Sequence, residues 1–79
     1  MSRKVMARIL AEMMVRLSLR EEEELYRELL YYFGLVGAAD ECAALERAWE
    51  DPYVNSRIRD YIEAWIRKRR KQEQIAYAV

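Results

Sequence analysis

The sequence predicts an all-α fold, a small four-helix bundle formed by residues 1–79 as a single domain, and three observations support it. Apolar residues recur at steps of three and four along most of the chain, which is the period of an amphipathic helix. Capping and glycine signals divide this pattern into four stretches, and their short connections favour antiparallel neighbours. With 53% apolar residues in only 79, the chain has more apolar surface than one small body buries, so we expect a homodimer.

The most strongly marked helix covers residues 52–74. Asp51 suits the N-cap because its carboxylate accepts from the free amides of the first turn, and Pro52 suits the first helical position. The basic run at residues 67–71 lies near the negative end of the helix dipole. One face carries the large apolar residues, which are Val54, Ile58, Tyr61, Ile62, Trp65 and Ile66. This helix therefore joins the widest apolar stripe to the densest positive charge.

Residues 3–17 predict an amphipathic helix with a charged edge that repeats every four residues. On that edge, Glu12 and Arg16 form a well-oriented i,i+4 pair. Four methionines lie within the first fourteen residues. We interpret these methionines as side chains that fill the core. The alternative is that they line an adaptable groove for a partner, because thioether side chains repack easily.

The second predicted helix covers residues 19–33. Ser18 followed by Glu21 is a capping-box pattern, which marks a helix start. Gly34 stands where a glycine commonly ends a helix. Two adjacent apolar rows on this helix face the core, one of Leu25, Leu29 and Tyr32 and the other of Tyr26, Leu30 and Phe33.

The four consecutive glutamates at residues 21–24 do not predict a metal site. Neighbouring helical residues point about 100° apart, so four in a row cannot converge on one ion. We interpret them as a solvated first turn that the dipole favours, with Glu23 paired to Arg27. The chain has no histidine, which excludes the usual nucleophilic triads and makes a zinc site improbable. We therefore expect no cofactor, no metal and no enzymatic activity.

The third predicted helix covers residues 38–50, with Gly37 as its N-cap. Cys42, the single cysteine, lies among alanines and acids and is expected to be a buried, inert thiol. Residues 75–79 form a tail that either extends the fourth helix, pairs as a strand, lies in a partner's groove or is disordered. The side chains that we expect in the core are Ile9, Leu10, Met13, Leu25, Leu29, Leu45, Trp49, Ile58, Ile62 and Trp65.

Charge is sorted along the chain although the net charge is zero. Residues 1–20 hold five cations and one acid, residues 21–51 hold two cations and ten acids, and residues 52–79 hold seven cations and three acids. The acidic middle either pairs with the basic flanks or leaves them to form one surface for polyanions. The longest uncharged run, residues 29–39, is too short to span a bilayer, and no secretory signal is visible, so we expect a cytoplasmic protein.

Two segments resemble the ribbon-helix-helix family of dimeric DNA-binding repressors. Residues 15–20, VRLSLR, read as a strand, alternate apolar with polar side chains, and a helix follows through residue 33. Residues 54–58, VNSRI, continuing to residue 70, are similar to the start of that family's second helix.

The resemblance implies that residues 15–20 pair as strands across a dimer, and that Arg16, Ser18 and Arg20 read bases. It also implies that the backbone near Asn55 and Ser56 anchors a phosphate. A ribbon-helix-helix dimer with an inserted helix is therefore the alternative fold. The two folds differ at residues 15–20, which would be a strand in the ribbon-helix-helix dimer and helical in the bundle.

From these patterns we expect a small regulatory protein that binds DNA with its basic C-terminal helix, because clustered cations supply phosphate contacts. The alternative is an assembly adaptor that holds a partner protein on an apolar helical surface. A solvated helix end and a membrane-surface helix are further interpretations of the basic run. The candidate nucleic-acid-binding residues are Arg16, Arg20, Asn55, Ser56, Arg57, Arg67, Lys68, Arg69, Arg70 and Lys71.

Overall fold

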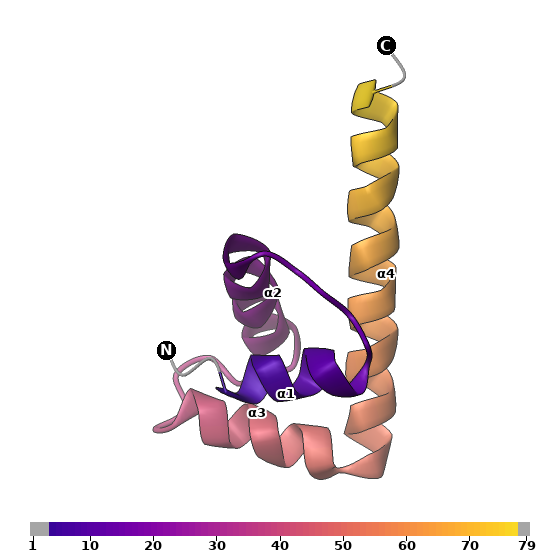
Figure 1. The fold of residues 1–79 in the computed structure, drawn as a ribbon. Coiled ribbons are helices and arrows are strands. Elements are labelled where there is room, and N and C mark those ends of the chain that lie inside the picture. The colour runs from indigo at the N-terminus through magenta and orange to yellow at the C-terminus, as the bar shows by residue number, and fades with distance from the viewer. Residues whose placement is uncertain (1–3, 78–79) are drawn as a thin grey trace.

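The computed structural model describes the backbone of residues 4–77 and the side chains of residues 4–71. This part of the chain contains four helices and no strand, which confirms the all-α prediction. Three helices gather around the lower part of the fourth, which continues beyond them as a single rod (Figure 1). The helices are α1 (Lys4–Glu12), α2 (Leu19–Tyr32), α3 (Glu41–Glu50) and α4 (Pro52–Tyr77).

Helices α3 and α4 are separated by Asp51 alone, and this residue caps both of them. Its amide donates to the carbonyls of Arg47 and Ala48 at the end of α3, each at 3.2 Å. Its carboxylate accepts from the amides of Tyr53 and Val54 at 2.9 and 3.1 Å, as the N-cap prediction requires. With so short a junction, α3 lies across the foot of α4 instead of antiparallel to it (Figure 1).

Helix α1 ends earlier than predicted, so the continuous helix over residues 3–17 is wrong beyond residue 12. Met14 adopts the left-handed conformation, with φ of 58°. Its amide donates to the Ala11 carbonyl at 3.1 Å, and the Val15 amide donates to the Leu10 carbonyl at 2.9 Å. These two bonds form a Schellman motif, in which a left-handed residue closes the last turn and turns the chain away.

Residues 13–18 consequently form a non-helical link that runs beside α4 from the end of α1 to the start of α2 (Figure 1). In the described chain, residues 15–18 belong to no helix and no strand, whereas residues 19 and 20 begin α2. The predicted Glu12–Arg16 helical pair is absent because the helix ends between the two. Glu12 instead lies 3.7 Å from Arg8 and accepts the indole N–H of Trp49.

Both ends of α2 follow the sequence pattern. The Ser18 hydroxyl accepts from the Glu21 amide at 3.2 Å, and the Glu21 carboxylate accepts from the Ser18 amide at 3.0 Å, which is the predicted capping box. Gly34 has a φ of +69°, and the Leu35 amide donates to the Leu30 carbonyl at 2.7 Å. This end is a second Schellman motif, here with the usual glycine.

Helix α3 begins at Glu41, three residues later than predicted. The N-cap is Asp40, whose carboxylate accepts from the Ala43 amide at 3.1 Å, and the proposed Gly37 cap is wrong. Gly37 has a φ of +85° and donates its amide to the Glu41 carboxylate, so it turns the chain before the helix. At the other end of the chain, α4 includes residues 75–77 of the predicted tail, and residues 78–79 lie outside the described part.

The core is formed where all four helices meet. Eight of the ten predicted core residues are buried, whereas Met13 and Trp65 are half-buried at its edge. Cys42 is also half-buried instead of buried, and its Sγ lies 3.3 Å from the Tyr26 hydroxyl. Trp49 is held by the Glu12 carboxylate and by the Arg59 guanidinium, which lies 4.7 Å from the ring centroid. The buried side chains are Val5, Met6, Ile9, Leu10, Leu25, Tyr26, Leu29, Leu30, Leu45, Trp49, Ile58 and Ile62.

Candidate nucleic-acid interface

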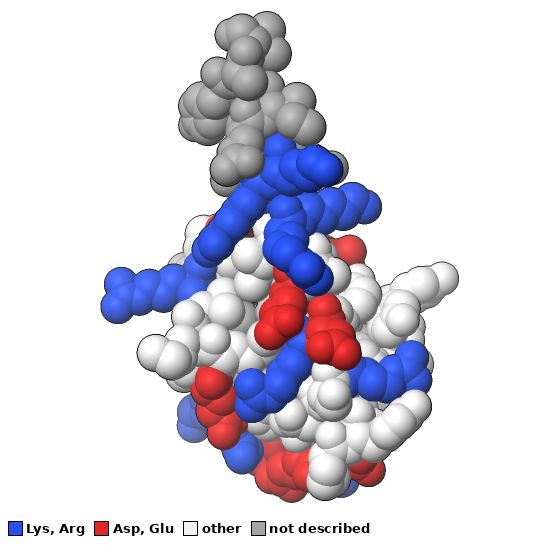
Figure 2. All heavy atoms as spheres, turned by 90° about the vertical axis from the view of Figure 1, so that its right-hand side faces the viewer, with Lys and Arg blue, Asp and Glu red and all other residues white. Residues whose placement is uncertain are grey.

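Six of the ten predicted site residues gather at one end of the molecule, which we call the basic end. They come from three segments, because the link and the start of α2 both lie against the upper part of α4. Figure 2 shows Lys and Arg side chains over this part of α4, above acidic side chains that lie lower on the same face. All six are exposed. The basic end consists of Arg16, Arg20, Arg67, Lys68, Arg70 and Lys71.

Arg69 belongs to the same run but has a structural role. Its guanidinium lies 3.1 Å from the Glu21 carboxylate and 2.7 Å from the Glu24 carboxylate, and it stacks over the Trp65 ring at 4.9 Å. The Trp65 indole N–H in turn donates to Glu28 of α2. These contacts attach α2 to α4, so part of the acidic stretch pairs with a basic flank inside the fold. Arg69 therefore holds α2 and α4 together, and its positive charge is largely offset by the two glutamates.

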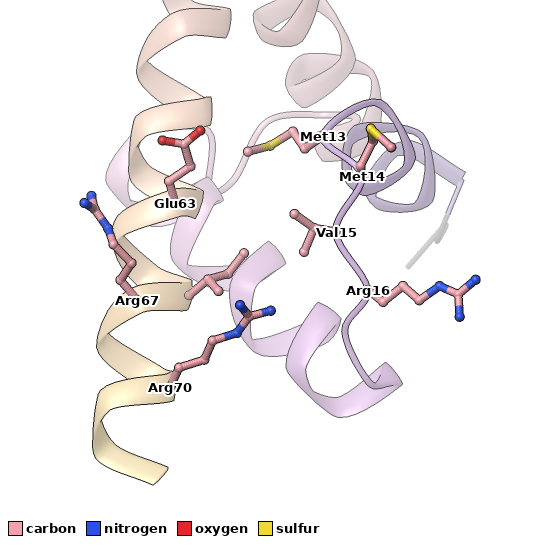
Figure 3. A pocket seen from close by; sticks show the side chains of 8 residues that line it. Met13, Met14, Val15, Arg16, Glu63, Arg67 and Arg70 are labelled. Atoms are coloured by element: carbon pink, nitrogen blue, oxygen red, sulfur yellow. The ribbon is translucent and has the colours of Figure 1, made fainter. Parts of the chain in front are cut away.

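A cleft of about 670 Å³ separates the link from α4 at this end. Its inner wall is largely apolar, because Met13 and Val15 point into it from the link (Figure 3) and Ile66 of α4 also lines it. Arg70 extends into the cleft, whereas Arg16 and Arg67 point away from it on either side (Figure 3). The cleft thus combines an apolar wall with one inward cation and the carboxylate of Glu63, and the two outward cations are exposed to a larger ligand.

Arg20 lies at the start of α2 and reaches the basic end through Glu24, which also pairs with Arg69 of α4. Its side chain is 89% exposed and its Nε is 3.7 Å from the Glu24 carboxylate. An ion pair that is this exposed contributes little to stability, so it leaves Arg20 able to exchange Glu24 for a phosphate. The ribbon-helix-helix resemblance implied that Arg16 and Arg20 lie on one side of a strand, whereas in the structure Arg16 belongs to the link and Arg20 to α2.

The remaining predicted residues lie at the opposite end of α4. Asn55 donates to the Trp49 carbonyl at 2.7 Å and accepts from the Arg59 guanidinium at 2.8 Å, so its side chain is used within the fold. Ser56 and Arg57 are exposed. The first amides of α4, which the resemblance assigned to a phosphate, donate to Asp51. Arg57 lies about 21 Å along the axis from Lys71, given about 1.5 Å per residue.

Three side chains near these surfaces have shifted pKa values. The pKa of the Glu21 carboxyl is lowered, first because the Ser18 amide donates to it, and further by the Ser18 side chain and Arg69. Burial raises the pKa of the Tyr61 hydroxyl, and the Glu28 carboxylate beside it raises it further. Burial also raises the pKa of the Tyr26 hydroxyl, with Cys42 adding to the effect. The structure thus keeps Glu21 charged and both phenols neutral.

Sequence reasoning missed several exposed apolar residues. Tyr31, Tyr53 and Met14 are 83%, 71% and 92% exposed, and the adaptor alternative considered a surface rich in methionine and tyrosine without singling out these two tyrosines. A signal for the tyrosines was present. Tyr53 lies off the apolar stripe of its helix, and Tyr31 stands outside the two apolar rows of α2. One exposed aromatic residue is ordinary, but several that lie off the buried faces of their helices are candidates for a binding surface.

Within the described residues, no group of three or more metal-ligating side chains lies close enough together to hold an ion. No helix in this part of the chain has the length and apolar character needed to cross a membrane.

Comparisons with protein-family models, with curated proteins and with solved structures found no match to this chain.

Proposed function

We propose that this chain is a small non-enzymatic regulator that binds DNA through the basic end. The observation that carries the proposal is the gathering of exposed cations from the link, from α2 and from α4 around one end of the molecule. Such a surface neutralises successive phosphates and releases the counterions condensed on them, which is the main source of affinity for a nucleic-acid backbone.

The zero net charge of the chain does not oppose this proposal, because the charges are sorted in space. Arg8, at the foot of the molecule, lies 3.4 and 3.6 Å from the carboxylates of Glu46 and Glu50 on α3. Two of the acids are thus paired away from the basic end, and Glu21 and Glu24, which lie beside it, are paired with Arg69. The local potential around the cations decides whether a polyanion approaches, since distant charges are screened within about 10 Å at ordinary salt.

The test is a mobility-shift titration of duplex and single-stranded DNA at about 50 mM and about 200 mM salt. We expect affinity that falls steeply with salt. The variant Arg70→Gln with Lys71→Gln removes two exposed cations, and we expect it to weaken binding and reduce the salt slope by about 1 to 2.

Arg47→Gln is the control variant, because Arg47 is an exposed cation of α3 away from the basic end. It should leave both affinity and salt slope unchanged. Absence of binding at low salt, or an equal effect of the two variants, would contradict a localised DNA site.

The cleft favours a second candidate function, assembly with a protein partner. Its Met13, Val15 and Ile66 side chains present apolar surface of the adaptable kind that accepts a partner helix. The same titration separates the two functions. An adaptor that binds only a protein partner should not bind DNA in a salt-dependent manner.

We also propose that the chain forms a homodimer. Leu19 and Val36 are more than half exposed in the single chain, and self-association is a simple way to cover them. Measuring the mass in solution by sedimentation over a range of concentrations tests this proposal before any binding constant is interpreted.

A further inference from the structure

Exposed tyrosine side chains form a second feature of the surface, in addition to the basic end. Tyr31, Tyr53 and Tyr32 are 83%, 71% and 56% exposed. Tyr32 of α2 packs on Tyr61 of α4, with ring centroids 4.7 Å apart and planes tilted by 37°. Tyr53 lies two turns before Tyr61 on the same face of α4. Isolated exposed apolar residues are ordinary, but several aromatic rings on one side of a small protein indicate a binding surface.

Along α4, Arg57 lies between Tyr53 and Tyr61, and two lysines follow further along the same row. Arg57, Tyr61, Ala64, Lys68 and Lys71 follow one another at steps of four, three, four and three, so they form one row on the helix. The Arg57 guanidinium lies 5.9 Å from the centroid of the Tyr53 ring. The row therefore leads directly into the basic end. We call Tyr31, Tyr32, Tyr53, Tyr61, Arg57 and Lys68 the tyrosine stripe.

Two hollows on the stripe share the Tyr32 and Tyr61 rings as walls. The first, about 380 Å³, also contacts Arg27 and Tyr31. The second, about 360 Å³, also contacts Arg57. Flat aromatic walls beside guanidinium groups suit a planar ring with a phosphate attached, because the ring stacks and the cation pairs with the charge.

Two carboxylates border these hollows and limit the choice of ligand. Glu28 accepts hydrogen bonds from Trp65 and Tyr61, so it is already used within the fold. Asp60 lies in the second hollow with Arg57 and partly offsets its charge. Charge alone is therefore weaker here than at the basic end, and a ligand must gain affinity from stacking as well.

We infer that the tyrosine stripe binds nucleic acid in single-stranded form, with bases stacked on Tyr31 and Tyr53 and phosphates paired with Arg57 and Lys68. In a duplex the faces of the bases are covered by their neighbours, whereas a single strand offers them to aromatic side chains. This inference rests on the proposed function and specifies the form of the nucleic acid. The strand passes from the stripe to the basic end along α4.

The experiment is a calorimetric titration of the full chain with oligothymidine of about 20 nucleotides and with a duplex of the same length, at about 100 mM salt. We expect the single strand to bind more tightly. Tyr31→Ala and Tyr53→Ala should each weaken single-strand binding by about fivefold or more, because base stacking contributes about 1–3 kcal/mol per base. Both side chains are exposed, so the variants keep the fold, which circular dichroism verifies.

Matched controls separate stacking from other causes. Tyr31→Phe and Tyr53→Phe keep the ring and lose the hydroxyl, so they should bind within about twofold of the unchanged chain if stacking is the cause. Lys68→Gln should weaken binding and lower its salt dependence.

Each outcome decides between distinct conclusions. Tighter binding of the duplex, or alanine variants of unchanged affinity, overturns the inference, and the proposed function survives if Lys68→Gln still weakens binding. No binding of either form overturns both. If Tyr31→Ala dissociates a dimer and leaves oligothymidine affinity unchanged, the tyrosines are a contact between copies and the inference fails.

Discussion

At the scale of the single residue, Met14 is the most unusual position of the described chain. It is the one non-glycine residue there with positive φ, and its side chain is 92% exposed, so no burial compensates for its conformation. Gly34 occupies the equivalent place at the end of α2. The Schellman motif of α2 places glycine in the left-handed conformation, which glycine adopts without steric cost. The motif of α1 places methionine there, and its Cβ makes that conformation unfavourable.

Met14→Gly should stabilise the protein. A left-handed conformation costs an L-residue about 1–2 kcal/mol, and glycine avoids this cost. Because glycine has greater freedom in the unfolded chain, the substitution also loses about 0.5–1 kcal/mol of stability. We expect a net gain of about 0.5–1 kcal/mol in the free energy of unfolding, measured by urea denaturation. Met14→Ala is the control, since alanine keeps the Cβ and should bring no such gain. A glycine variant no more stable than the alanine variant would contradict the backbone argument, and a loss of stability in both variants would show that the methionine side chain makes a stabilising contact.

At the scale of the helix, Glu21 serves two elements. It completes the capping box of α2 with Ser18, and it accepts from Arg69 of α4 at 3.1 Å. Its pKa is lowered by these partners, so the folded state holds the carboxylate in its charged form. The unfolded chain takes up this proton first as the pH falls, and the stability that Glu21 contributes is present at neutral pH and lost in acid.

Glu21→Gln should therefore flatten the acid side of the stability profile. The amide can still accept from the Ser18 backbone but cannot carry charge or titrate. We expect the variant to be less stable than the unchanged chain at about pH 7, with a difference that shrinks as pH falls from about 5 to about 3. Urea denaturation across this range measures it. Glu22→Gln removes the same charge from the same turn, so an equal effect there would assign the result to the helix dipole.

At the scale of the whole molecule, all four helices contribute buried side chains to one small core. Ile62 of α4 is fully buried within it, whereas Ile66, one turn further, is half-buried at the cleft. A chain of this length is stable by only about 4–12 kcal/mol in total, at about 0.05–0.15 kcal/mol per residue. A single large cavity therefore removes a large share of the stability.

Ile62→Ala should lower the free energy of unfolding by about 2–5 kcal/mol, and thermal denaturation should show a correspondingly lower midpoint. Ile66→Ala removes the same atoms from a less enclosed position and should cost clearly less. Equal losses at the two positions would mean that the cleft is closed in solution, for example by a second copy of the chain.

Much of this architecture was readable from local signals. The capping box at Ser18, the Asp51 cap and the periodic core positions all depend on neighbours within a turn or two, and the structure confirms them. The end of α1 was not readable, because the apolar period of a helix continues without interruption through Leu17. Tertiary packing decides there, since Val15 and Leu17 lie against the core from a non-helical link.

The candidate site shows the same limit. Sequence identified the basic residues 67–71 and the flanking Arg16 and Arg20, but their meeting depends on the path of the link. It also could not show that Arg69 pairs with two acids of α2, or that Asn55 pairs within the fold, because these partners are distant in sequence. Such contacts follow from how helices dock and not from any local pattern.

The setting of the two tryptophans provides a built-in reporter of intrinsic fluorescence. Trp49 is buried at the foot of the molecule between Glu12 and Arg59, whereas Trp65 is half-buried under Arg69, next to the basic end. The chain has no other indole. With Trp49 replaced by phenylalanine, the emission of Trp65 becomes a label-free signal from the docking surface between α2 and α4. A ligand that displaces Arg69 from its ring would change that emission directly.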